Sequence, residues 1–466
     1  MRRWGLSVEA IGDLGNRLQR FWRYYGQWTR TRTRDTSAYG SDYVSGLLRI
    51  QGNRTMANIA REAQVAEQNM QHFMSYSPWS GPALIEQVQQ GIVERPELQG
   101  GILILDESAD EKSGDSSAGA GRQHNGRMGK VDESQVGVYL AYAKQQHWTL
   151  WDGCLFIPEK WFSAEATQRR AKAEIPSERI FQTKVELGWQ MIERAKATGL
   201  TFEAVAFDSL YGRSHWLRER CAHASLEYYA DIPNNYPLYR KAPVLEFEQG
   251  KRGKPLQKFQ IVGQVALHAA EFARLPQTVW EKLTLRPTER GQMQVEFARY
   301  RVWTVSRTGT VREETLLLKR EGPTIRYSLT NAPSSTDLAT LAYRKCQRYF
   351  VERSLQDAKS ELGMADFQAL KYRAWEHHLA LTLVASWFIA ETRLDWAEEF
   401  PPDAHLLRDY ATDTLPRLSM SNVCELLRAV LPLRQLSAQQ AAALVIQHLD
   451  NRTRSRRARL RNHPGP

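Results

Sequence analysis

The sequence is poor in cysteine and has no hydrophobic run long enough to cross a membrane. Its four cysteines in 466 residues are scattered, and no two have CxxC spacing. This argues against a disulfide framework and against a zinc site, and it fits a reducing compartment. The longest apolar stretch, roughly Leu379 to Ala390, is typical of a buried helix, and no signal-peptide core follows the basic start Met1-Arg2-Arg3-Trp4. We therefore expect a soluble intracellular protein with no membrane partner.

The composition is that of a folded protein with an excess of positive charge. Apolar residues make up 42% of the chain and 14 residues are tryptophan, which excludes a disordered chain. The length is enough for two to four domains. The net charge of +11 favours a polyanionic partner, and a solvated basic surface is the alternative.

Residues 1–95 are predicted to be helical, because apolar residues recur at helical spacing at Ile11, Leu14, Leu18, Phe21 and Trp22. Within them, residues 55–74 predict two short helices with a tight turn near Gln64. The second helix would carry Asn69, Gln71 and His72. This resembles a helix-turn-helix whose polar residues read base edges, although many helix pairs with this pattern do not touch DNA.

From residue 102 the pattern changes to alternating strands and helices. The predicted elements are strands at Ile102–Leu105, Gln135–Tyr142 and Trp148–Ile157, a helix at Thr183–Ala197, a strand at 203–207, a helix near His215–Ala222 and a strand at Glu227–Ile232. This β-β-β-α-β-α-β order is that of a ribonuclease-H-like α/β core. In that fold the first strand is central and the fourth pairs beside it, so their ends meet.

The expected core is interrupted by a β-rich insert. The predicted domains are a helical DNA-binding domain at 1–95, the first part of the core at 96–240, the insert at 241–333, the second part of the core at 334–395, and a helical C-terminal region at 396–466. Within the insert, strands are expected at Met293–Phe297, Tyr300–Val305, Thr315–Lys319 and Ile325–Leu329. The core resumes with a helix from about Asp337 to Leu362 and a second from Trp375 to Thr392, and the chain ends in a basic tail at Arg452–Arg459.

Three acidic residues lie at informative positions in these elements. Asp106 and Asp208 each end an apolar strand, and Glu352 lies on the helix predicted from Asp337. A carboxylate at the end of a buried strand usually has a partner. Two magnesium ions held by such a set can cut and rejoin phosphodiesters, with Asp106 bridging both ions and Asp208 and Glu352 each holding one.

The helix that carries Glu352 also carries basic residues on the same face. Arg348, Glu352, Leu355 and Lys359 follow i, i+4, i+7, i+11 spacing, so Arg348 and Lys359 are candidate phosphate ligands beside Glu352. An ordinary exposed ion-pair face is the alternative. Adjacent histidines His377 and His378 point apart and do not indicate a zinc site.

These motifs resemble those of bacterial insertion-sequence transposases of the DDE type, in the branch that bears a β-insert. The resemblance covers nearly the whole chain. The similar segments are LILDES at Leu103–Ser108, the Gly-rich Ser117–Ala143, PEKW at Pro158–Trp161, FQTKVELGWQMI at Phe181–Ile192, AFDSLYG at Ala206–Gly212, RYSLTNAP at Arg326–Pro333 and RYFVERSLQDAKSELGM at Arg348–Met364. One departure is Lys345, which stands where the family signature has a tyrosine.

The resemblance implies a transposase that binds the terminal inverted repeats of its element, with Mg²⁺ or Mn²⁺, two ions per site, as cofactor. It would nick double-stranded DNA and use the freed 3′-OH for second-strand cleavage and target joining. In insert-bearing relatives this passes through a DNA hairpin with an aromatic side chain receiving a flipped base. Trp303 is our candidate, with Trp280 in reserve and core packing as the alternative.

Other expectations follow from the same resemblance. Arg122 and Lys130, in the Gly-rich segment, are expected to contact DNA. The active form is expected to be a homodimer on paired DNA ends, in the bacterial cytoplasm and associated with the nucleoid. The alternatives are a catalytically inactive, transposase-derived DNA-binding protein, and another ribonuclease-H-like nuclease such as a junction resolvase. The insert, the helical N-terminal region and the length argue against the resolvase.

Overall fold

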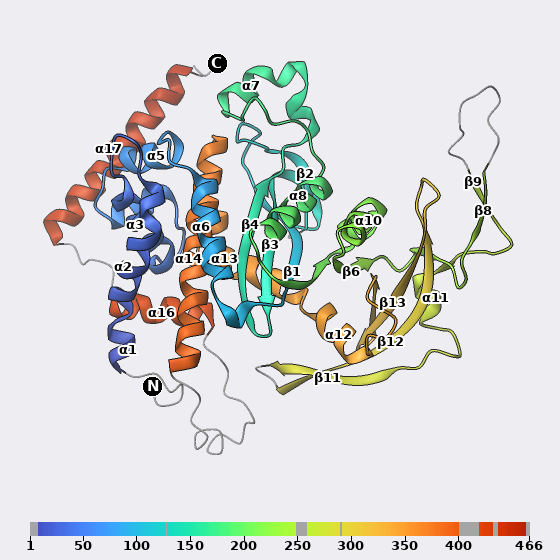
Figure 1. Cartoon of the computed structure of the whole chain (residues 1–466). Helices are drawn as coiled ribbons and strands as arrows, with labels where there is room; N and C mark the ends of the chain where they lie inside the picture. Colours follow the sequence, from blue (N-terminus) through green and yellow to red (C-terminus); the bar gives the residue numbers. More distant parts are fainter. Residues whose placement is uncertain are drawn as a thin grey trace.

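A large mixed sheet runs through the chain, with helices packed on it (Figure 1). The computed structural model describes residues 8–126, 128–247, 259–288, 291–399, 419–431 and 437–462. The start Met1–Trp4 lies outside the described residues. The sheet has ten strands in the order β11-β12-β13-β14-β6-β5-β1-β3-β2, and β4 pairs with β3. This mixed α/β architecture is consistent with a ribonuclease-H-like core.

The centre of the sheet joins strands that are distant in the sequence. The strands of this part are β1 (Gly101–Glu111), β2 (Gly121–Asn125), β3 (Lys130–Lys144), β4 (His147–Leu155), β5 (Phe202–Phe207) and β6 (Glu227–Ile232). Strand β1 pairs with β3 in antiparallel and with β5 in parallel fashion, as the sequence predicts for its first and fourth strands. The apolar runs of β1 and β5 are buried, which is typical of strands covered on both faces.

Two expectations about this region were incomplete. Strand β1 does not end at Asp106 but continues to Glu111, because β3 pairs with it as far as Ser134. The Gly-rich segment Ser117–Ala143 also contains β2, which pairs with β3 and for which no strand was predicted.

Helices pack on both faces of the central strands. Leu105 and Glu107 of β1 face α8 (Lys184–Ala197): a Cβ at Gly188 would meet the Leu105 side chain, and Lys184 pairs with Glu107. Asp106, between them, faces α13 (Tyr349–Glu361), in keeping with the alternation of side chains along a strand. Helix α8 begins with a capping box at Thr183, and α10 (His215–His223) follows β5.

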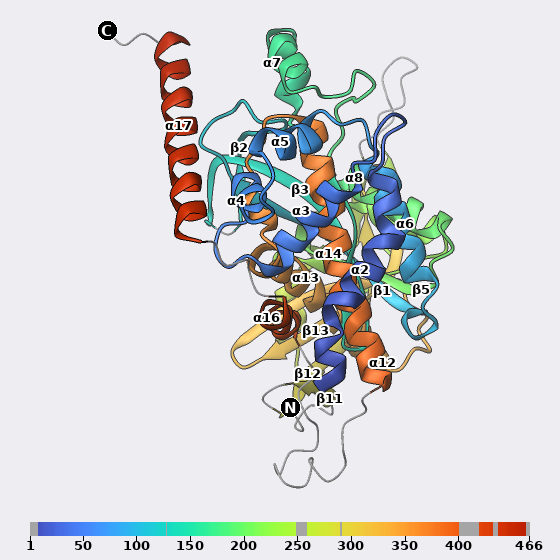
Figure 2. The ribbon, with the colours of Figure 1, turned by 90° about the vertical axis from the view of Figure 1, so that its left-hand side faces the viewer.

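The N-terminal helices pack around a long helix, α14 (Tyr372–Glu399) (Figure 2). They are α1 (Val8–Gly12), α2 (Leu14–Tyr25), α3 (Ser37–Arg49), α4 (Met56–Glu62), α5 (Glu67–Ser75) and α6 (Gly81–Val93). The five apolar residues predicted to form a helical stripe, Ile11 to Trp22, are all buried. They belong to the same continuous hydrophobic core as α14 and the central strands. A domain boundary near residue 95 remains a prediction.

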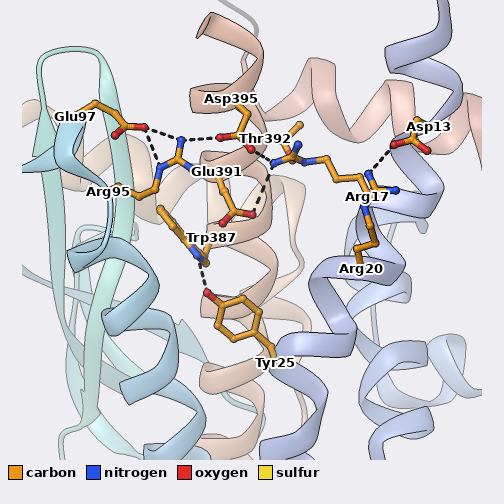
Figure 3. Close-up of polar contacts among 10 residues, drawn as sticks. All are labelled: Asp13, Arg17, Arg20, Tyr25, Arg95, Glu97, Trp387, Glu391, Thr392 and Asp395. Carbon is orange, nitrogen blue, oxygen red and sulfur yellow. Dashed lines mark hydrogen bonds and ion pairs between the residues drawn. The ribbon is translucent and has the colours of Figure 1, made fainter. Parts of the chain in front are cut away.

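Polar contacts also fix α2 and the segment after α6 to α14 (Figure 3). Asp395 of α14 pairs with Arg17 of α2 and with Arg95, whose Nη2 lies 2.6 Å from its Oδ1. Arg17 Nε also donates to the Thr392 hydroxyl at 2.9 Å. One carboxylate that binds two arginines from different segments sets how the N-terminal helices sit on α14.

The helix predicted from Asp337 to Leu362 is two helices, α12 (Leu338–Cys346) and α13. Around the break, the amides of Gln347, Arg348 and Phe350 bond to carbonyls three residues back. Such 3₁₀-type bonding tightens the backbone and interrupts the regular α-helix. Arg348 therefore lies at the junction, and Glu352 lies in the first turn of α13.

Residues 241–333 contain strands that continue the sheet beyond β6. The main ones are β11 (Glu281–Thr288), β12 (Gly291–Val305), β13 (Val311–Glu321) and β14 (Thr324–Thr330), and β14 pairs with β6. The two strands expected at Met293–Phe297 and Tyr300–Val305 are one continuous strand, β12. Because β14 pairs with β6, these strands continue the same hydrogen-bonded sheet (Figure 1). Strands β8 (Val244–Phe247) and β9 (Phe259–Val262) pair with each other in a separate two-stranded sheet.

The C-terminal region contains two described helices. Helix α16 (Met420–Val430) buries Met420, Val423 and Leu427 in the main core. Helix α17 (Ala438–Asn462) includes the basic run, in which Arg452, Arg454, Arg456 and Arg457 are exposed. Across the described part of the chain, no helix combines the length and apolarity that spanning a bilayer requires.

Candidate active site

The pairing of β1 with β5 brings the first two acidic candidates together. Leu105 and Phe207 are partners in the parallel register, and Asp106 and Asp208 are the next residues of each chain segment. Asp208 also caps the short helix α9 (Ser209–Gly212), where its Oδ1 accepts hydrogen bonds from the amides of Leu210 at 2.9 Å and Tyr211 at 3.4 Å. Its carboxylate is therefore held at the end of the strand.

The surroundings of the two aspartates favour their protonated forms. Burial, and then the charge of Asp208, raise the pKa of Asp106 to about 7. Burial, and then the charge of Glu107, also raise the pKa of Asp208. Carboxylates that are buried beside each other resist ionisation unless a cation neutralises them. This is the electrostatic character expected of a cation site.

Arg348 lies between Glu352 and Asp106 and contacts both. The Glu352 carboxylate is 56% exposed and its Oε1 lies 2.8 Å from Arg348 Nη2. Arg348 Nη1 lies 3.6 Å from Asp106 Oδ2. Among the residues that the structure describes, no three His, Cys, Asp or Glu side chains are gathered closely enough to hold a metal ion together. The structure thus places Asp106 and Asp208 side by side and connects Glu352 to them through Arg348.

The two candidate phosphate ligands on this helix have different surroundings. Arg348 is 13% exposed and contacts acidic groups on three sides. Lys359 Nζ lies 2.5 Å from Asp110 and 3.0 Å from the Ala109 carbonyl oxygen, so it joins α13 to the far half of β1. Lys359 therefore does not share the surroundings of Glu352, contrary to the expectation that both side chains point to one place. Contacts of either residue with DNA remain a prediction.

Sequence reasoning missed a fourth acid in this cluster. Asp231, near the end of β6, lies 2.9 Å from Arg348 Nε and 2.7 Å from Lys345 Nζ. It also accepts a hydrogen bond from the Ser328 hydroxyl at 2.6 Å. Burial acts to raise the pKa of Asp231, but Lys345 and Arg348 outweigh it and hold the pKa below the ordinary value. The available signals were an acid inside the buried strand EYYADI and the unexpected Lys345.

The aromatic candidates lie on the strands beyond β6. Trp303 is half-buried on β12, and its backbone exchanges hydrogen bonds with Tyr239 at 2.8 and 2.9 Å. Arg301, on the same face, is held by Glu313 and Thr315 of β13. The reserve candidate Trp280 packs against a second hydrophobic cluster, with the Arg320 guanidinium 3.7 Å from its ring centroid. The ring of Trp303 is therefore less tightly packed than the ring of Trp280.

The remaining DNA-binding candidates are on the surface. Asn69, Gln71 and His72 are exposed on α5, and Gln64 between α4 and α5 has a positive φ of 57°, as a tight turn there requires. Arg122 is exposed on β2. Lys130 is exposed too, but its Nζ lies 2.7 Å from Asp132.

Comparison with known proteins shows the family of the chain. Residues 23–292 match the DDE superfamily endonucleases, a segment that includes Asp106 and Asp208 and ends before Glu352. The chain is also 25% identical over 367 residues to the "Probable transposase for insertion sequence element IS701" of Microchaete diplosiphon, covering 75% of this chain and 81% of that protein. The matched segment is more than half of the 466 residues. The chain therefore belongs to the DDE superfamily of endonucleases.

Proposed function

We propose that this protein is an active DNA transposase whose catalytic residues are Asp106, Asp208 and Glu352. The observation that carries the proposal is the parallel register of β1 and β5, which sets Asp106 beside Asp208 opposite the helix that bears Glu352. Nothing in folding requires two adjacent, partly buried carboxylates with raised pKa values. A function that uses a cation accounts for them.

The donor set fits divalent magnesium, and manganese as a substitute. All three side chains offer carboxylate oxygens, the hard ligands that Mg²⁺ prefers. When bound, two such ions would activate the attacking oxygen and stabilise the leaving oxygen of a phosphodiester. Asp106, on the central strand, would hold the ions together with Asp208 and Glu352. Glu352 is exposed enough to turn from Arg348 toward the aspartates.

DNA would be held by basic and polar side chains on several other elements. Asn69, Gln71 and His72 on α5 would read the terminal repeat, and Arg122 and Lys130 would contact its backbone. The arginines of α17 would add salt-dependent affinity. Because two ends must be joined in concert, the active complex would be a homodimer on paired ends, which mass measurement with and without end DNA tests.

The experiment that tests the catalytic assignment is strand cleavage on DNA that carries the inverted repeats flanking the gene. Asp106→Asn, Asp208→Asn and Glu352→Gln should each lose cleavage and strand transfer while still binding end DNA. Glu361→Gln, on another face of the same helix, is the matched control and should cleave normally. Cleavage retained by any one of the three variants would remove that residue from the site. An unaltered chain that binds the ends but never cuts in Mg²⁺ or Mn²⁺ would favour the inactive, DNA-binding alternative.

The second strand would be cut through a hairpin, with Trp303 stacking on an extruded base. Stacking on an aromatic ring contributes about 1–3 kcal/mol per base. Trp303→Ala should leave the first nick intact and reduce hairpin formation, and an abasic site at the extruded position should partly restore it. Trp280→Ala, which removes a ring packed against the second hydrophobic cluster, is the control variant. If the unaltered protein forms no hairpin in a time course, the reaction takes another route.

A further inference from the structure

Asp231 connects four elements at the candidate site. Its Oδ1 accepts from Ser328 of β14 at 2.6 Å and lies 2.7 Å from Lys345 of α12. Its Oδ2 lies 2.9 Å from Arg348 Nε, at the junction of α12 and α13. The side chain of Asp231 is only 13% exposed. Two oxygens with three donors make a fixed anchor, since little freedom remains for the carboxylate to turn.

The contact at Nε determines where the rest of Arg348 points. A guanidinium is planar and rigid, so fixing Nε fixes the directions of both terminal nitrogens. In this structure Nη1 faces Asp106 at 3.6 Å and Nη2 faces Glu352 at 2.8 Å. Nε of Arg348 is thus bound to Asp231, which is outside the proposed catalytic set. The terminal nitrogens of Arg348, Nη1 and Nη2, face Asp106 and Glu352, which belong to that set.

Asp231 also pairs with the positive charge of Lys345. Lys345 is 4% exposed and stands where a tyrosine is expected from the family signature. A buried ammonium requires a counterion, and Asp231 supplies it at 2.7 Å. With Lys345 paired in this way, Arg348 is the cation left to offset the charge of Asp106 and Glu352.

We propose that Asp231 is a positioning residue that anchors Arg348 across the catalytic acids. While Asp106 and Glu352 are free of divalent ions, the outer nitrogens of Arg348 neutralise them. When those carboxylates bind divalent ions, Arg348 stays on Asp231 and its outer edge is free to bind a DNA phosphate. This inference rests on the proposed function, since it takes Asp106 and Glu352 as metal ligands.

The inference predicts opposite effects of two substitutions on metal affinity. Arg348→Ala removes a cation that competes for Asp106 and Glu352, so divalent ions should bind more tightly. Loss of the Asp231 charge leaves Arg348 with only those two acids as partners, so divalent ions should bind more weakly. Because Asp231 acts through Arg348, its replacement should have no further effect once Arg348 is alanine.

The test measures Mn²⁺ binding to the full chain without DNA, by the electron paramagnetic resonance signal of the free ion. Asp231→Asn alone would strand the buried Lys345, so it is combined with Lys345→Gln. We expect Arg348→Ala to lower the Kd about threefold or more and D231N/K345Q to raise it by a similar factor. The triple variant should bind as Arg348→Ala does. Asp152→Asn breaks another buried carboxylate–arginine pair, Asp152–Arg194 at 2.8 Å, and should leave the Kd unchanged.

The outcomes separate this inference from the proposed function. If Asp106→Asn binds Mn²⁺ as well as the unaltered chain does, the proposed metal site is wrong. If Asp106→Asn loses binding but D231N/K345Q matches the unaltered chain, only the anchor is wrong. Additive effects in the triple variant would also overturn it, since they would mean that Asp231 acts independently of Arg348. Should D231N/K345Q fail to fold, Arg348→Ala decides alone, and unchanged or weaker Mn²⁺ binding refutes the inference.

Discussion

Asp106→Asn should stabilise the metal-free protein at alkaline pH while it removes DNA cleavage. Burial and the charge of Asp208 raise the pKa of Asp106 from 3.8 to about 7 in the folded chain. The folded state therefore holds this proton more tightly than the unfolded state does. The stability that Asp106 contributes is complete below pH 4 and is lost as the pH rises through 7.

The size of the effect follows from the two pKa values. A difference of about three pH units, at about 1.4 kcal/mol per unit, corresponds to a penalty of about 4 kcal/mol once Asp106 is ionised in the folded chain. Asparagine keeps the shape and carries no charge, so it avoids this penalty. The pKa of about 7 already includes the favourable contact with Arg348, so the net gain at pH 8 should be about 4 kcal/mol.

The assay is urea unfolding in the presence of a chelator at pH 5 and pH 8. The unaltered chain should have the lower midpoint at pH 8, and Asp106→Asn should raise the midpoint at pH 8 far more than at pH 5. Asp231→Asn is the matched control within the same cluster. Because Lys345 and Arg348 hold the pKa of Asp231 below its ordinary value, its replacement should destabilise the chain at pH 8. A destabilised Asp106→Asn at pH 8 would refute the electrostatic account of the site.

Three further predictions concern other parts of the chain. Glu314→Gln should cost about 3–5 kcal/mol in urea unfolding, because it breaks a fully buried pair with Arg218 at 3.0 Å. Burial lowers the pKa of His377 and of His378 from 6.5 to about 4. The stability that these neutral histidines contribute should therefore be complete above pH 6.5 and fall as the pH drops toward 4. Urea unfolding midpoints measured over this pH range check this, and midpoints that do not change with pH contradict it. Gln71→Ala should cost about 1–3 kcal/mol of binding to end DNA but not to random duplex, and equal losses in a competition assay would show that α5 does not read bases.

The sequence predicted the centre of the sheet well because its signal there is local. Continuous apolar runs identify β1 and β5, and parallel pairing then places Asp106 beside Asp208. The break before α13 gave no such signal, since the segment Arg344–Arg348 has neither proline nor glycine. The role of Asp231 was also invisible, because its partners lie about a hundred residues further along the chain and meet it only in the folded state.

Buried polar contacts explain how the segment between β6 and α12, which contains β11 to β14, is fixed to the core. Its last strand, β14, pairs with β6 in the register that sets Ser328 opposite Asp231. Its strand β13 carries Glu314, which meets Arg218 of α10 inside the protein and accepts a hydrogen bond from Tyr228 of β6 at 2.5 Å. A slip of β14 by one residue would turn Ser328 to the other face and remove one of the three donors to Asp231. The register of β14 is therefore fixed in part by Asp231, the acid that anchors Arg348. An error in the pairing of β14 with β6 would disturb the candidate active site.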